Sequence, residues 1–446
     1  MSSVSFSARR IATSTLTLLT EGVLRLGLTA LVSFWIARAL GPAQFGMLNV
    51  ASALMVIFLA LGGLGLEVPA VWRLATQSTH QGAVLGTVLG LRVGASLVAC
   101  ALAAAAALLL RHEDPQALAV CLIVALAILG YAPSVFDLWF KAHVEAGAPA
   151  LARLATTLLS SAAKLACLAL DGGVIALAWT VVLEAGLNSL LLWLAWRHAS
   201  RGRLSDALAP DRRLASALLR DGAPYLGSQL TGMVAAKIDV LLLGYLCSHA
   251  QTGLYSVVQK LSEVACIVPV VLVDAAYPAL ARRMQADADP AHGQLLFDLA
   301  AAAALLSALG GSLLAGPLIG LVFGDTYAQA VPLQQWHLWT CVAAALGAAR
   351  HRWLATQGLQ RHVPTIAAVG ALLSVALNLA LVPHWGAMGA VATALVAPLV
   401  AGCLTSFLIR DLRATGVMQA RALWPWARLL DTTRRSLLAQ SPVPRP

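Results

Sequence analysis

The sequence predicts an all-α polytopic membrane protein with twelve transmembrane helices in two six-helix lobes and both termini in the cytoplasm. Three observations support this prediction: the composition, the number of long apolar stretches and the distribution of Lys and Arg. Of the 446 residues, 59% are hydrophobic and 11% are charged, and the mean hydropathy is +0.80. Soluble domains have about 25% charged residues. The composition therefore excludes an ordinary soluble enzyme, a disordered regulator and a nucleic-acid-binding domain.

Twelve stretches are long and apolar enough to cross a bilayer, which takes about 20 helical residues. The first follows a polar segment that ends in Arg9 and Arg10. It is too long for a cleaved signal peptide, so we interpret it as a span. The predicted spans are residues 12–38, 45–66, 83–110, 117–140, 149–170, 173–196, 215–245, 252–276, 294–322, 329–349, 364–383 and 386–409.

Lys and Arg gather in alternate loops. One set of alternate loops, which includes both termini, holds 22 of the 30 Lys and Arg residues, whereas the opposite set holds only Arg111. Because cytoplasmic loops are enriched in these residues, the pattern predicts cytoplasmic termini and an even number of spans. The same loops explain the net charge of +10, so this charge does not indicate a nucleic-acid partner.

The longest hydrophilic stretch lies near the middle of the chain and is rich in arginine. We therefore predict an N-terminal lobe at 1–200, a basic cytoplasmic linker at 201–213, a C-terminal lobe at 214–410 and a basic cytoplasmic tail at 411–446. Six spans in each half keep both halves in the same orientation. This arrangement indicates a parallel repeat with the substrate path between the lobes.

Short glycine-containing elements recur at similar places in the two halves and support the repeat. The separations between corresponding glycines are 207, 211 and 213 residues. The corresponding pairs are Gly46 with Gly253, Gly147 with Gly358, and Gly173 with Gly386.

Enzymatic motifs are absent from the sequence. It has no GxxxxGK[ST] phosphate loop, no HExxH and no GxSxG. The seven cysteines form no CxxC pair, so neither a zinc site, another metal site nor a disulfide framework is indicated. The predicted outer loops are also too short for a catalytic site outside the bilayer. We therefore predict a secondary transporter without catalytic residues or a bound cofactor.

Charged residues inside the spans identify the candidate substrate site. Such residues are costly in the bilayer and usually face the protein interior. Glu21 and Arg25 are spaced to pair on one helix face. An equal alternative to a functional role is that this pair only fixes helix packing. The deep cations outnumber the acids close to them in sequence, which indicates a cationic cavity for an anionic substrate such as a phosphate or diphosphate. The predicted substrate-binding residues are Arg25, Arg92, Arg153, Lys164 and Lys260.

Four acids in the predicted spans are candidates for coupling transport to H+ or Na+. They are Glu21, Glu184, Asp239 and Glu263. Arg153 also has an alternative role, because a long side chain near a helix end can extend to the membrane surface.

Four motifs resemble those of polysaccharide-export flippases. Residues 38–46, RALGPAQFG, resemble the LGPxxFG element after the first helix. Residues 239–260, from Asp239 to Lys260, resemble the element that joins the seventh and eighth helices, and Phe323-Gly324 with Tyr327 resembles the loop after the ninth. The most specific match is LNLALVP at 377–383 followed by GAMGAVAT at 386–393. In this order the motifs resemble the oligosaccharidyl-lipid (Wzx-type) branch of the multidrug/oligosaccharidyl-lipid/polysaccharide exporter superfamily.

The resemblance implies a MATE-like fold in the bacterial inner membrane. It implies that the cargo is an undecaprenyl-diphosphate-linked oligosaccharide, moved from the cytoplasmic to the periplasmic leaflet for O-antigen, capsule or exopolysaccharide assembly. The implied partners are this glycan, membrane lipids, and a polysaccharide polymerase with its chain-length regulator. The alternatives are a cation-coupled multidrug exporter of the same superfamily, which a cationic cavity disfavours, and a membrane glycosyltransferase or polymerase, which the short outer loops disfavour.

Overall fold

The computed structural model describes residues 8–76, 81–111, 114–200, 210–287 and 290–423. Within these ranges the chain forms helices joined by short turns and contains no strand, which confirms the all-α prediction. Ten helical segments are long and apolar enough to cross a membrane. The chain forms two compact units: unit 1 is Met1–Val257 with Gly320–Ala328, and unit 2 is Val258–Ile319 with Gln329–Pro446.

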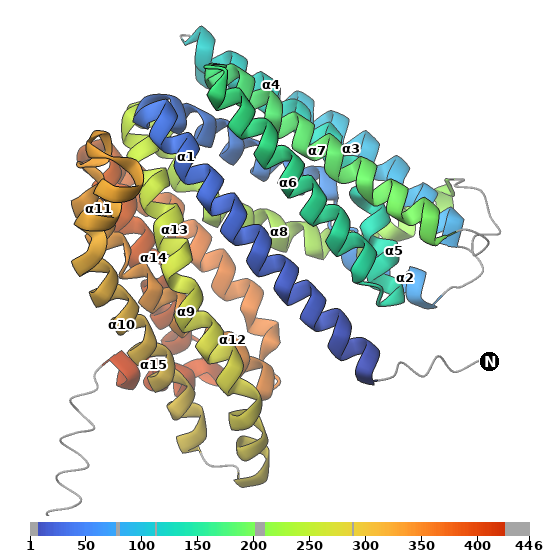
Figure 1. Ribbon diagram of the computed structural model, residues 1–446. Coiled ribbons are helices and arrows are strands. Elements are labelled where there is room, and N and C mark those ends of the chain that lie inside the picture. The colour runs from blue at the N-terminus through green and yellow to red at the C-terminus, as the bar shows by residue number, and fades with distance from the viewer. Residues whose placement is uncertain (1–7, 77–80, 112–113, 201–209, 288–289, 424–446) are drawn as a thin grey trace, which may run out of the picture. The chain divides into compact units, whose positions relative to one another are not determined.

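Unit 1 is built around its first helix, which contacts most of the other long helices of the unit. In Figure 1, α3, α4, α6 and α7 lie side by side. Two short helices, α2 and α5, pack against each other, and the 3-10 helix η1 (Ala132–Val135) leads into α5. The helices are α1 (Ala8–Gly63), α2 (Glu67–Thr76), α3 (Gln81–Arg111), α4 (Pro115–Tyr131), α5 (Phe136–His143), α6 (Gly147–Ala169), α7 (Gly173–Ala199), α8 (Arg212–Leu246) and the start of α9 (His249–Asp287).

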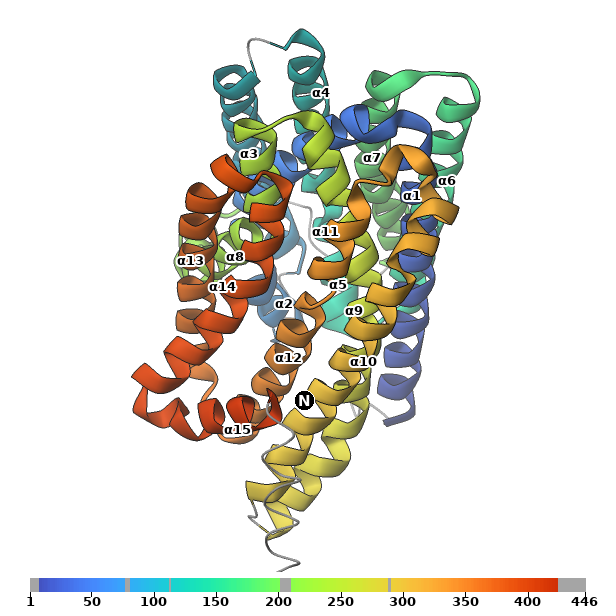
Figure 2. The same cartoon turned by 90° about the vertical axis from the view of Figure 1, so that its left-hand side faces the viewer.

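Unit 2 contains the rest of α9 and the helices that follow. Figure 2 shows α13 and α14 side by side, with α15 at the end of α14. Its core includes the fully buried Phe297 and Leu354. The helices are α10 (Pro290–Phe323, whose last residues belong to unit 1), α11 (Ala330–His337), α12 (Thr340–Thr356), α13 (Val363–Trp385), α14 (Ala387–Leu408) and α15 (Arg413–Leu423).

The helix α1 is two helices joined at a kink. Gly41 has φ 71° and ψ 172°, a backbone conformation that interrupts the helix, and Pro42 follows it. Glycine adopts a positive φ without a steric penalty, and proline suits the first turn of a new helix. The apolar segment Thr20–Gly63 has 44 residues, which rise by about 66 Å at 1.5 Å per residue, twice the thickness of a bilayer core. The first two predicted spans, 12–38 and 45–66, both overlap this segment.

The tenth predicted span, 329–349, lies on α11 and α12, which have 8 and 17 residues. Neither helix is long enough to count among the ten spans. The number of twelve spans and the cytoplasmic location of the termini therefore remain predictions. The division between the units falls within α9, whereas most of the predicted linker 201–213 lies outside the described residues. The two six-helix lobes also remain a prediction.

A disulfide in unit 2 corrects one expectation from the sequence. Cys266 on α9 is bonded to Cys341 on α12, with a Cα–Cα distance of 4.9 Å and a sequence separation of 75. Closely spaced cysteines can be paired from sequence alone, but this pair forms because two helices far apart in the chain pack in one core.

Two glycines of the sequence repeat bring α1 and α9 into close contact within unit 1. A Cβ atom at Gly46 would overlap the backbone carbonyl of His249, and one at Gly253 would overlap the carbonyl of Pro42. These glycines occupy equivalent positions in the sequence repeat, and the structure places them at one shared contact. The segment 320–328 is joined to α1 as well, because the Tyr327 hydroxyl donates a hydrogen bond to the Ala37 carbonyl at 2.8 Å.

We predict that Gly46→Ala destabilises the protein by about 1–3 kcal/mol, since overpacking a tight contact has that cost. The measurement is the thermal unfolding midpoint of the purified protein in detergent. Gly22→Ala is the matched control on the same helix, because nothing lies within 4 Å of a Cβ atom there. Equal midpoints for the two variants would contradict the predicted close contact.

Candidate functional site

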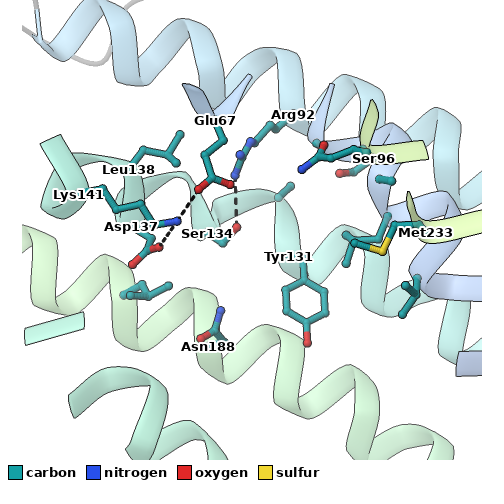
Figure 3. Close-up of a pocket in the computed structure, with 18 of the residues that line it drawn as sticks. Glu67, Arg92, Ser96, Tyr131, Ser134, Asp137, Leu138, Lys141, Asn188 and Met233 are labelled. Carbon is teal, nitrogen blue, oxygen red and sulfur yellow. Dashed lines mark hydrogen bonds and ion pairs between the residues drawn. The ribbon is translucent and has the colours of Figure 1, made fainter. Parts of the chain in front are cut away.

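A polar cavity of about 300 Å³ lies inside unit 1. Figure 3 shows its side chains converging from several helices of the unit. Ligand pockets in proteins start at about this volume. Its charged lining residues are Glu67 from α2, Arg92 from α3, Asp137 and Lys141 from α5, and Arg153 from α6.

Two ion pairs of the site form between residues of the same helix. Asp137 and Lys141 are four residues apart on α5, and Glu21 and Arg25 are four residues apart on α1. Residues at this spacing lie on one helix face, so opposite charges can meet. The distances are 3.2 Å from Lys141 Nζ to Asp137 Oδ2 and 3.0 Å from Arg25 Nε to Glu21 Oε1.

Contacts between helices join these pairs into one chain of alternating charge. Lys141 Nζ lies 2.7 Å from Glu67 Oε1, and Arg153 Nη1 lies 2.8 Å from Asp137 Oδ1. Arg153 Nε also lies 3.5 Å from Glu21 Oε1, which extends the chain to α1. The ionic chain, in order, is Glu67, Lys141, Asp137, Arg153, Glu21 and Arg25. Its three acids and three bases balance, so it has no net charge.

Arg92 lies beside this ionic chain and is not part of it. Its Nη1 donates a 3.4 Å hydrogen bond to the Ser134 hydroxyl, and its Nε is buried without a hydrogen-bond partner among the described residues. Glu67 and Asp137 are near enough to attract its charge, but neither forms an ion pair with it. Arg92 therefore gives the cavity its one uncompensated positive charge within the described part of unit 1.

Neutral polar side chains complete the wall. Ser96, Tyr131, Asn188 and Gln229 line the same cavity. Hydroxyl and amide groups of this kind bond readily to sugar hydroxyls or phosphate oxygens. The site thus combines a guanidinium that can bind an anion with donors and acceptors for a polar headgroup.

The structure brings together four of the nine predicted site residues. Arg92 and Arg153 line the cavity, and Glu21 and Arg25 join it through Arg153. Lys164 and Glu184 form a separate pair, with Nζ 2.5 Å from Oε2. The cations inside the predicted spans have more acidic partners than the sequence indicated, because acids on other helices pair with them.

The remaining three predicted residues lie outside the cavity lining. Asp239 is 6% exposed and accepts a hydrogen bond from the Tyr255 hydroxyl. Its Oδ1 has no hydrogen-bond partner in the described part of the chain. Lys260 and Glu263 belong to unit 2.

Sequence reasoning missed Glu67, Asp137, Lys141 and Ser134. The i, i+4 spacing of Asp137 and Lys141 was a usable signal, identical to that of Glu21 and Arg25. Lys141 directly follows the predicted span 117–140, where a positive charge supports the predicted topology whether or not it faces the protein interior.

The fold is shared with transporters of the multidrug/oligosaccharidyl-lipid/polysaccharide exporter superfamily. The lipid II flippase MurJ, in an inward closed conformation, matches with a TM-score of 0.65 at 11% identity over 92% of this chain and 91% of that one. An inward-facing multidrug resistance MATE family transporter matches with a TM-score of 0.61 at 15% identity over 87% and 95%. A MATE transporter from Vibrio cholerae matches with a TM-score of 0.53 at 18% identity over 94% and 98%. At these identities the likeness shows the fold and confirms the MATE-like prediction.

The family is shown by the sequence itself. Residues 11–284, more than half of the chain, match the model of the family described as polysaccharide biosynthesis protein, and the chain belongs to this family. No curated protein matches the chain.

We predict that Asp137→Asn lowers stability by about 2 kcal/mol or more, because it removes the acid that pairs with both Lys141 and Arg153 in a mostly buried setting. Glu67→Gln, at a carboxylate 47% exposed, should cost less than about 1 kcal/mol. Thermal unfolding of both purified variants measures the difference. An Asp137→Asn variant as stable as wild type would show that the ionic chain does not stabilise unit 1.

Proposed function

We propose that this protein is a flippase that moves an undecaprenyl-diphosphate-linked oligosaccharide from the cytoplasmic to the periplasmic leaflet of the bacterial inner membrane. The observation that supports this most directly is the uncompensated guanidinium of Arg92 in the polar cavity of unit 1. Membership of the polysaccharide biosynthesis family agrees with such a cargo. The protein would act by transport and would have no catalytic residues.

The cavity suits a diphosphate for an electrostatic reason. A guanidinium presents a planar set of donors that binds phosphate oxygens in pairs. Arg92 is available for this role because no carboxylate among the described residues neutralises it by direct contact. Sugar hydroxyls next to the diphosphate would contact the neutral groups, including Asn188 and Gln229. The lipid tail would remain in the bilayer.

The ionic chain provides further cations as the diphosphate enters. Lys141 and Arg153 face the same cavity as Arg92 and are each held by two carboxylates. A diphosphate bound at Arg92 competes with Asp137 and Glu67 for these cations. We infer that cargo binding rearranges the ion pairs and that this rearrangement is one step of alternating access. In this proposal Arg25, Lys164 and Lys260 contact the cargo at other stages of transport.

Transport of a charged headgroup needs a driving force, which we assign to H+ or Na+. Asp239 is the strongest coupling candidate, since its Oδ1 is buried and without a hydrogen-bond partner among the described residues. Glu21, Glu184 and Glu263 are the other candidates. The delivered repeat unit would pass to a polymerase with its chain-length regulator for O-antigen, capsule or exopolysaccharide assembly.

Deletion of the gene tests the cargo. We expect a complete undecaprenyl-linked repeat unit to accumulate in the lipid extract and surface polymer to disappear, as read by mass spectrometry and a surface-polysaccharide gel. Unchanged lipid-linked glycans and unchanged polymer, in a strain without a second flippase, would overturn the proposal. Assays of drug and cation efflux would then test the multidrug alternative.

Complementation of the deletion strain tests Arg92. We predict that Arg92→Gln reduces surface polymer at least tenfold, since a hydrogen bond to a charged group contributes about 1.5–3 kcal/mol. Arg92→Lys should retain part of the activity because it keeps the charge. Arg38→Gln is the control: Arg38 donates to the Leu321 carbonyl at 3.1 Å, away from the cavity lining. If Arg92→Gln is present in the membrane at the wild-type level and restores full export, Arg92 does not bind the cargo.

A further inference from the structure

Arg350 on α12 is a buried cation in unit 2, and no acid of the described residues pairs with it. Arg350 is 8% exposed, and neither its Nε nor its Nη1 has a hydrogen-bond partner among the described residues. Removal of a guanidinium from water without compensation costs several kcal/mol. The position therefore requires an anion or other acceptor.

The surroundings of Arg350 leave space for such a group. A Cβ atom at Gly402 on α14 would lie 2.5 Å from Nη1, so a larger residue there would displace the guanidinium from its present position. Gln419 on α15 is 6% exposed, and its Oε1 is also without a partner in the described part of the chain. All three residues line a cavity of about 20 Å³. This volume accommodates about one oxygen-sized atom, such as a single phosphate oxygen.

An apolar groove adjoins this cavity along α14. The groove has a volume of about 460 Å³ and shares Leu399 and Cys403 with the wall of the Arg350 cavity. Phe407 is 50% exposed and Leu408 is 72% exposed. A hydrocarbon chain in this groove would therefore lie against residues that also enclose the guanidinium. The groove is lined by Leu399, Val400, Cys403, Leu404, Phe407 and Leu408.

We propose that Arg350 and the α14 groove bind a phosphate-bearing membrane lipid, with a phosphate oxygen on Arg350 Nη1 and an acyl chain in the groove. A hydrogen bond between a guanidinium and a phosphate is strong because both groups are charged. The positive-inside pattern predicts that this end of α12 is cytoplasmic, next to the leaflet whose anionic headgroups attract basic residues. The site lies wholly within unit 2 and does not depend on the cargo proposed for unit 1.

Native mass spectrometry of the purified full chain in detergent tests the site. The probes are dioleoyl phosphatidylglycerol, the uncharged dioleoylglycerol and inorganic phosphate. We expect phosphatidylglycerol to bind wild type at least tenfold more tightly than dioleoylglycerol, and Arg350→Gln to abolish this preference. Arg352→Gln is the matched control and should leave it unchanged, because Arg352 is an exposed arginine paired with Asp274.

The groove has its own test, which remains valid if Arg350→Gln does not fold. Leu408→Gln changes an exposed side chain, and we expect weaker binding of phosphatidylglycerol with the affinity for inorganic phosphate unchanged. Wild type that does not prefer phosphatidylglycerol, or a folded Arg350→Gln that keeps the preference, would overturn the proposal. Inorganic phosphate that binds as tightly as the lipid, together with a Leu408→Gln variant like wild type, would identify free phosphate as the ligand and overturn the lipid assignment.

Discussion

Compensation of charge inside an apolar bundle is the constraint on which the arrangement of unit 1 depends. An unpaired ion in such a setting is far more costly than a missing apolar contact. Six charges from α1, α2, α5 and α6 meet this constraint by forming one continuous ionic chain. The ionic chain links several helices at once, because each of its charged residues except the two at its ends contacts two partners. The helices that carry these charged residues also line the cavity.

Arg92 in unit 1 and Arg350 in unit 2 do not belong to such an ionic chain. Each has a buried guanidinium nitrogen without a partner among the described residues. Their surroundings differ, and so do the ligands that we propose. Arg92 faces a cavity of about 300 Å³ with many polar groups, whereas Arg350 faces about 20 Å³ beside an apolar groove. The first suits a large polar headgroup and the second suits the phosphate of a lipid.

The features that depend on neighbours in the chain could be predicted from the sequence. Long apolar runs placed the helices, and the gap between the predicted spans 12–38 and 45–66 contains Gly41, where α1 is kinked. Pairing across helices could not be predicted: Arg153 was a predicted substrate-binding residue, but its partner Asp137 could be identified only once α5 and α6 were placed together. The Cys266–Cys341 disulfide was missed for the same reason. The break between α11 and α12 was missed because residues 329–349 contain no charged residue that would mark an interruption.

Equilibrium binding of undecaprenyl diphosphate to the purified protein in nanodiscs tests the central claim most directly, since it needs no knowledge of the sugar or the coupling ion. The comparison ligand is undecaprenol, which has the same tail without the diphosphate. The account predicts that wild type prefers the diphosphate, that added salt weakens this preference, and that Arg92→Gln lowers the affinity for the diphosphate by about 10- to 100-fold. Equal affinity for the two lipids, or an Arg92→Gln variant that binds the diphosphate like wild type, would contradict it.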